Sequence, residues 1–154
     1  MRTDVEKRLQ ELGLELPPAP PAGGVYHPVV RVDNLLYVSG QGPVQGDGSL
    51  ITGKVGADLT TAEGFLAARQ VGLTMLSTIH EQGYLPSLFR LVKTLGMVNC
   101  TPEFSEQPQV INGFSELMEL IMGEEHGRGA RSAVGMILPG QIAVEIEAIF
   151  ELRE

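Results

Sequence analysis

The chain ends in the stretch "ARSAVGMILPGQIAVEIEAIFELRE", residues 130–154, which reads as two apolar strands joined by a short turn. In the second strand, every other residue is apolar, and the intervening set includes Glu145 and Glu147. Successive side chains of a strand point to opposite faces of the sheet, so these two glutamates share one face, about 6.6 Å apart along the strand. Ala143 and Ile149 lie on the same face. Acids mixed with apolar residues predict a sheet face that a second surface partly covers, and a neighbouring subunit would supply that surface.

A lone arginine, Arg131, opens the first of these two strands. The short "LPG" connection after it predicts that Arg131 lies near the end of the last strand, where an ordinary ion pair with a glutamate at the sheet edge would account for it. Glu145 and Glu147 would be explained equally well if their face of the sheet is exposed to solvent. On the residues alone, these structural explanations stay open beside a functional one.

The rest of the chain alternates between strand and helix patterns. The spacing of apolar residues predicts, in chain order, a hairpin at residues 25–44, a brief strand at 50–54, a long helix at 60–83, a strand buried on both faces at 89–100 and a second helix at 107–124. Asp33-Asn34 is a plausible hairpin turn, and Thr60 with Glu63 forms a capping-box pattern. With the two final strands, this order predicts an α+β fold, a mixed β-sheet with two helices packed on one face.

Residues 1–23 precede the main domain, which we place at residues 24–154. Thr3 and Glu6 form a capping-box pattern at the start of a short amphipathic helix. Its apolar face carries Val5, Leu9 and Leu12, by which we expect it to pack on the main domain, outside the chemistry. The run "PPAPPAGG" then predicts a semi-rigid extended connector.

Composition narrows the possible functions. Eleven Lys and Arg against 19 Asp and Glu give a formal charge of −8, which opposes nucleic-acid binding because that binding relies on basic residues. No apolar run approaches the roughly 20 residues of a membrane helix, and the charged start does not resemble a signal peptide, so we expect a cytoplasmic protein. Three scattered histidines, His27, His80 and His126, have no ligand spacing, so no metal site is predicted.

Four segments, in order, resemble the RidA family, also called YjgF or L-PSP endoribonuclease-like proteins. They are "LLYVSGQGPV", "RLVKTLGMVN", "VINGFSELM" and the final "ARS" followed by "LP" and "EIEA", and the resemblance covers residues 24–152. It implies a chorismate-mutase-like fold that assembles as a homotrimer with ligand clefts between subunits. For the deaminase branch it implies hydrolysis of enamine and imine products of pyridoxal-phosphate enzymes, such as 2-aminoacrylate, to 2-keto acids and ammonia, without a cofactor.

The resemblance also assigns roles to individual residues. Arg131 matches the arginine that grips the substrate carboxylate, and Glu145 matches the carboxylate that activates water or transfers a proton. Ala133 falls where a backbone carbonyl holds the water, a position at which several family members have cysteine. The remaining residues implied in substrate binding are Tyr26, Gly40, Gln41 and Asn112.

Three departures from the family pattern leave the substrate open. The N-terminal helix with its connector is an addition to the short family members, the segment between Arg131 and "LP" is one residue shorter, and His27-Pro28 follow the pocket tyrosine. Two other functions stay in view: an endoribonuclease that inhibits translation, which the net charge opposes, and a trimer that binds small metabolites without turnover.

Overall fold

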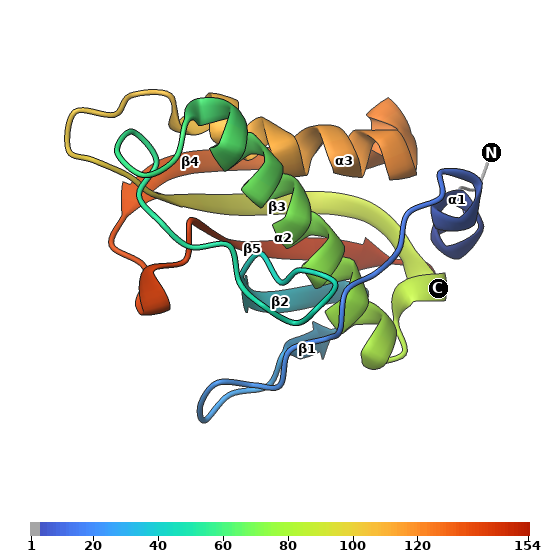
Figure 1. The fold of residues 1–154 in the computed structure, drawn as a ribbon. Coiled ribbons are helices and arrows are strands. Elements are labelled where there is room, and N and C mark those ends of the chain that lie inside the picture. Colours follow the sequence, from blue (N-terminus) through green and yellow to red (C-terminus); the bar gives the residue numbers. More distant parts are fainter. Residues whose placement is uncertain (1–3) are drawn as a thin grey trace.

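Five strands form one mixed β-sheet in the order β1-β2-β5-β3-β4 (Figure 1). The strands span Val29–Val32 (β1), Leu35–Gln41 (β2), Leu88–Asn99 (β3), Ala130–Met136 (β4) and Val144–Leu152 (β5). β3 and β4 run parallel, and every other neighbouring pair is antiparallel. This computed structural model describes residues 4–154, and its architecture is the predicted α+β fold.

Two long helices, α2 (Thr61–Glu81) and α3 (Gln107–Gly127), cover the same face of the sheet (Figure 1). The predicted capping box at the start of α2 is confirmed, because the Thr60 side chain accepts from the Glu63 amide while Glu63 accepts from the Thr60 amide. The helices approach closely at Gly113, where a Cβ would overlap the backbone of Phe65. Gly113 is therefore a packing residue of the helix layer.

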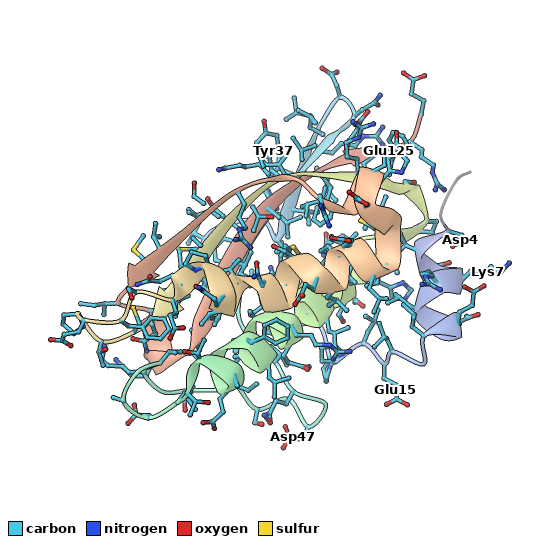
Figure 2. All side chains as sticks on the ribbon, turned by 90° about the horizontal axis from the view of Figure 1, so that it is seen from above. Asp4, Lys7, Glu15, Tyr37, Asp47 and Glu125 are labelled. Carbon is cyan, nitrogen blue, oxygen red and sulfur yellow. The ribbon has the colours of Figure 1, made fainter. Side chains whose placement is uncertain are left out.

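The core lies between these helices and the sheet. Alternate residues of β5 are buried beneath the helices, namely Val144, Ile146, Ala148, Phe150 and Leu152. The intervening residues, Glu145 to Glu151, therefore leave the opposite face, as the alternation predicted. Tyr37 of β2 lies on that outer face as well, opposite Ile149 in the register, and Figure 2 shows it on the side of the sheet away from the helices.

The N-terminal helix α1 (Val5–Glu11) packs on the main domain with Val5 and Leu9 in the core, as predicted. Its N-cap is Asp4, whose carboxylate accepts from the Lys7 amide, whereas the predicted cap Thr3 lies outside the described residues. Arg8 donates to the carbonyl oxygen of Leu120 in α3 at 3.2 Å. That carbonyl belongs to the turn before α3 breaks at Gly123, where φ is 84°.

Two predictions of local structure are corrected. Residues 50–54 form no strand but two single bridges, Val44 to Leu50 and Thr52 to Ile142. The second long helix continues three residues beyond its predicted end, past the break at Gly123, to Gly127. None of the helices within residues 4–154 is long and apolar enough to cross a membrane.

Candidate functional site

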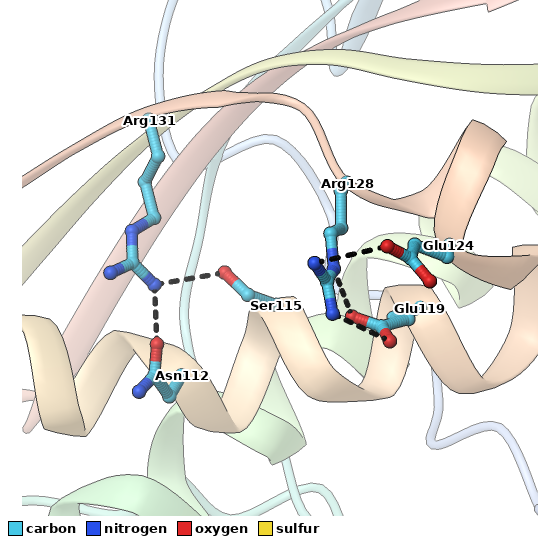
Figure 3. Close-up of polar contacts among 6 residues, drawn as sticks. All are labelled: Asn112, Ser115, Glu119, Glu124, Arg128 and Arg131. Carbon is cyan, nitrogen blue, oxygen red and sulfur yellow. Dashed lines mark hydrogen bonds and ion pairs between the residues drawn. The ribbon is translucent and has the colours of Figure 1, made fainter.

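The side chain of Arg131 extends from β4 toward helix α3. In the register of the sheet it stands opposite Thr94 of β3, a residue buried under α3. Its Nη1 donates to Asn112 Oδ1 at 2.7 Å and to Ser115 Oγ at 3.1 Å, both on α3 (Figure 3). Asn112 and Ser115 are three residues apart and so lie on one face of the helix. Together they hold one nitrogen of the guanidinium in place.

The other edge of the same guanidinium is open. Within residues 4–154, Nε and Nη2 of Arg131 have no hydrogen-bond partner, and the residue is exposed. These two nitrogens point their hydrogens in the same direction, in the fork geometry that matches the two oxygens of a carboxylate. With Nη1 fixed and the Nε and Nη2 edge open, the guanidinium of Arg131 has a geometry that suits a carboxylate or another anion.

The predicted position of Arg131 near the end of the last strand is wrong. β3 lies between β4 and β5, so Arg131 and the final strand are not neighbours. The sheet-edge ion pair is also not formed, because the described partners of Arg131 are an amide and a hydroxyl. It is Arg128 that forms an ion pair, with both oxygens of Glu119, at 2.6 and 3.1 Å (Figure 3).

A cavity of about 790 Å³ opens beside Arg131, between α3 and the β4 end of the sheet. Asn112, Ser115 and Thr94 line it on the side of Arg131. Arg8 and Arg128 line it too, together with Glu116, Glu119 and Glu124. Arg8 forms an ion pair with Glu11, and Arg128 forms ion pairs with Glu119 and Glu124, whereas the described partners of Arg131 are neutral side chains. Arg131 is therefore the arginine of this cavity whose positive charge is least compensated.

Glu145 stands in a second place, on the outer face of β5. Its carboxylate lies against Gly40 of β2, where a Cβ would come within 2.5 Å of Oε2. Gly40 falls in an irregular step of the β2 to β5 register, between Val38 and Gln41. Burial raises the pKa of the Glu145 carboxyl above its ordinary value, and the nearby negative charge of Glu147 raises it further. A carboxyl with a raised pKa is suited to proton transfer near neutrality.

A pocket of about 300 Å³ surrounds Glu145. Tyr26, Gly40 and Gln41, three of the residues predicted to bind substrate, line it. The side chain of Gln41 is already engaged, since Nε2 donates to the Ser39 carbonyl and Oε1 accepts from the Thr78 hydroxyl at 2.8 Å. Gln41 therefore supports the wall of the pocket more than it offers a free amide to a ligand.

The predicted site residues thus form two groups. Arg131 and Asn112 are together on the helix-covered face, and Ala133 follows two residues after Arg131 on β4. The other four, Tyr26, Gly40, Gln41 and Glu145, line the pocket of Glu145. One chain does not bring the two groups together, because β3 separates their strands and Arg131 and Glu145 leave opposite faces of the sheet.

Two contributors were missed in the sequence. Ser115 is the second acceptor for Arg131, and its spacing of three from Asn112 was a signal that could have revealed it. The proline-rich connector, treated as a spacer, lines the pocket of Glu145 with Pro20, Pro21 and Ala22. Its position immediately before Tyr26 was the available signal. No group of three His, Cys, Asp or Glu side chains in the described part of the chain is placed to hold a metal ion.

Comparison with known proteins identifies the family of the chain. A family model described as "YjgF/chorismate_mutase-like, putative endoribonuclease" matches residues 6–142. "Protein TCP17" of Trypanosoma cruzi is 43% identical over 151 residues, which cover 97% of this chain and 94% of that protein.

Solved structures share the fold. A protein of Shewanella oneidensis MR-1, described as a "putative endoribonuclease", is 32% identical with a TM-score of 0.89, over 96% of this chain and 99% of that one. RidA from an Antarctic Psychrobacter species is 27% identical with a TM-score of 0.58, over 86% and 93% of the two chains. With its family model matched over most of its length, the chain belongs to the YjgF/chorismate mutase-like family.

Proposed function

We propose that this chain is a cofactor-independent deaminase that hydrolyses reactive enamines and imines, such as 2-aminoacrylate and its 2-imino tautomer, to 2-keto acids and ammonia. The observation that carries the proposal is the guanidinium of Arg131, fixed at Nη1 by Asn112 and Ser115 and open at Nε and Nη2. A fixed fork orients a small carboxylate, and orientation of a reactant can lower a barrier by several kcal/mol. The likeness to RidA and the sequence motifs of that family support the same reaction class.

The reaction needs one water and a group that relays protons. Water adds to the imine carbon, the electrons of the C=N bond move to nitrogen, and nitrogen takes up a proton. The resulting carbinolamine then loses ammonia as the C–N bond breaks and the C=O bond forms. Glu145 serves as the relay, because a carboxyl with a raised pKa can accept the proton of the water and return one to the departing nitrogen.

We assign the complete site to the contact between two copies of the chain. The separation of Arg131 from Glu145 on opposite sheet faces supports this, since neither group alone holds both a carboxylate clamp and an acid-base group. In such a contact, Arg131 of one copy lies beside Glu145 of the next, so the two copies use different surfaces. Heterologous contacts of this kind form rings when they close. The resemblance to RidA supports a ring of three copies, a homotrimer.

The outer face of the sheet supports the same assembly. Five apolar side chains on it are exposed: Val30, Val32, Tyr37, Val134 and Met136. These side chains lie toward both edges of the sheet, on β1 and β2 and on β4, and apolar surface left exposed on one face supports an interaction surface there. Sedimentation equilibrium at micromolar concentration tests the trimer, and a monomer under those conditions would exclude the shared site.

Endoribonuclease activity is the second candidate, because the matching family model and the Shewanella protein carry that description. The net charge of −8 opposes it, and the arginines near Arg131 are offset by glutamates. Phosphate contacts would give RNA binding a steep dependence on salt. Binding of labelled RNA measured at several salt concentrations separates this candidate from the deaminase.

Timed release of keto acid tests the proposal directly. A panel of amino acids is oxidised or dehydrated in situ, and the appearance of 2-keto acid is followed with and without the protein. We expect the protein to accelerate release for at least some imines. Binding of keto acids without any acceleration would indicate a trimer that only binds metabolites.

A further inference from the structure

The connector before the main domain forms one wall of the Glu145 pocket. Pro20, Pro21, Ala22 and Gly23 line it together with Leu50, Ile142 and Pro139 from other parts of the chain. Among the described residues that line this pocket, Glu145 is the only charged one. The wall contributed by the connector is therefore apolar. It carries no positive charge that could pair with an acidic side chain of a ligand.

Specific contacts hold this wall in position. The Ser77 hydroxyl of α2 donates to the carbonyl oxygen of Pro17 at 2.6 Å, and this contact is buried. At the other end, the Gly23 amide donates to the Tyr26 hydroxyl at 2.9 Å. Three further prolines lie between these two anchors and restrict the backbone, so the connector is semi-rigid.

We infer that this connector wall makes the site select 2-imino and 2-keto acids with an aliphatic side chain, of the branched type found in leucine, over those with a methyl group or an acidic side chain. The inference rests on the proposed function and names its substrate class. With the carboxylate held by Arg131 and the reacting carbon near Glu145, the apolar surfaces of Pro20, Pro21, Leu50 and Ile142 remain for the side chain.

Electrostatics and size favour the same class. Glu145 and Glu147 share the outer face of β5, so an acidic side chain would meet negative charge without a compensating cation in the pocket. A methyl group would leave much of the apolar wall uncovered, and each additional buried methylene strengthens binding. At about 300 Å³ the pocket matches the small end of the range for small-molecule sites.

Calorimetric titration of the intact protein with three 2-keto acids tests the inference without requiring turnover. The probes are pyruvate, 4-methyl-2-oxopentanoate and 2-oxoglutarate. We expect 4-methyl-2-oxopentanoate to bind at least ~10-fold more tightly than pyruvate, a ratio within the reach of an apolar pocket, and 2-oxoglutarate to bind most weakly.

A double substitution in the wall, Pro20→Gly with Pro21→Gly, should reduce that preference to about 2-fold, since it removes the apolar rings and frees the backbone. The matched control is Pro18→Gly, which loosens the same connector at an exposed position outside the pocket. We expect the control to keep the preference, with melting temperatures of all variants compared.

The results separate this inference from the proposed function. If the preference for the branched keto acid is present and depends on Pro20 and Pro21 while no imine is deaminated, the function fails and the selectivity stands. If imines are deaminated but pyruvate binds as tightly as the branched acid, or the double variant keeps the preference, the inference is overturned. Failure of all three keto acids to bind would overturn it as well.

Discussion

The carboxylate of Glu145 occupies the space that a side chain at Gly40 would need. A Cβ at position 40 would stand 2.5 Å from Oε2 of Glu145, closer than such atoms approach, and 3.1 Å from its Cδ, which is a tight contact. The conformation of Gly40 does not require glycine, because its φ is not positive. Glycine is needed at this position for the space above it, and that space holds the acid to which we assign proton transfer.

Gly40→Ala should therefore displace Glu145 and lower deamination by at least ~10-fold, because a misplaced catalytic group loses its alignment with the reacting atoms. Gly46→Ala is the matched control, since nothing lies within 4 Å of a Cβ there. Initial rates of keto-acid release measure both variants. Equal rates for the two would show that the position of the Glu145 carboxylate is not important.

Arg131→Lys distinguishes a carboxylate clamp from a structural arginine. Lysine keeps the charge but loses the fork, so we expect deamination to fall by at least ~100-fold, which corresponds to about 2.7 kcal/mol of transition-state binding. The same substitution at Arg128, whose fork is engaged by Glu119, should change the rate less than ~3-fold, since exposed ion pairs contribute about 0–1 kcal/mol. An Arg131→Lys protein that hydrolyses 2-aminoacrylate at the parent rate would make Arg131 structural.

Glu147→Gln should shift the pH dependence of catalysis. Burial is the main cause of the raised pKa of Glu145, and the charge of Glu147 adds to it. Removing that charge makes ionisation of Glu145 easier, so its pKa falls. If the ionised form accepts the proton of water, the acid limb of the profile of kcat/KM against pH moves to lower pH. If the acid limb of the profile does not move although the variant assembles as the parent does, the limb reports the ionisation of a group other than Glu145.

Glu145→Gln should increase stability at neutral pH although it abolishes catalysis. The folded-state pKa of Glu145 lies above its unfolded value, so between the two values the folded state binds more protons and stability falls as pH rises. The charged form is thus disfavoured in the folded protein at neutral pH, and the amide avoids that cost. Near pH 4 and below, where Glu145 becomes protonated in both states, the advantage should disappear. Thermal melts across this range measure the difference, and a variant less stable than the parent at neutral pH would contradict the expected sign.

Sequence patterns predicted the elements well because their causes are local. The capping box at Thr60 and Glu63, the turn at Asp33-Asn34 and the alternation along β5 each depend on residues a few positions apart. The register of the last strand also confirmed that Glu145 and the buried Ile146 face opposite sides.

The position of Arg131 was not predictable in the same way. Two strands joined by a short connection often pair, but here β3 enters between β4 and β5 and takes both as neighbours. Which strand lies between two others depends on pairing across the whole chain. The same limit concealed the connector as a pocket wall, because its packing against Ser77 links residues 60 positions apart. The sequence motifs therefore pointed to the candidate site residues but not to their separation on opposite faces of the sheet.

The separation of Arg131 from Glu145 makes a mixing experiment decisive. Arg131→Lys and Glu145→Gln should each be nearly inactive, but each keeps the half of the site that the other lacks. If every cleft takes Arg131 from one subunit and Glu145 from the next, random hybrids from an equal mixture, formed by co-expression, should contain intact clefts in about one case in four, and so recover about a quarter of the parent activity. Each variant expressed alone is the control. Trimers must persist in every sample by sedimentation, so that a failure to recover activity reflects the clefts and not the assembly. Hybrids as inactive as their parents would place Arg131 and Glu145 in separate sites and exclude the shared cleft.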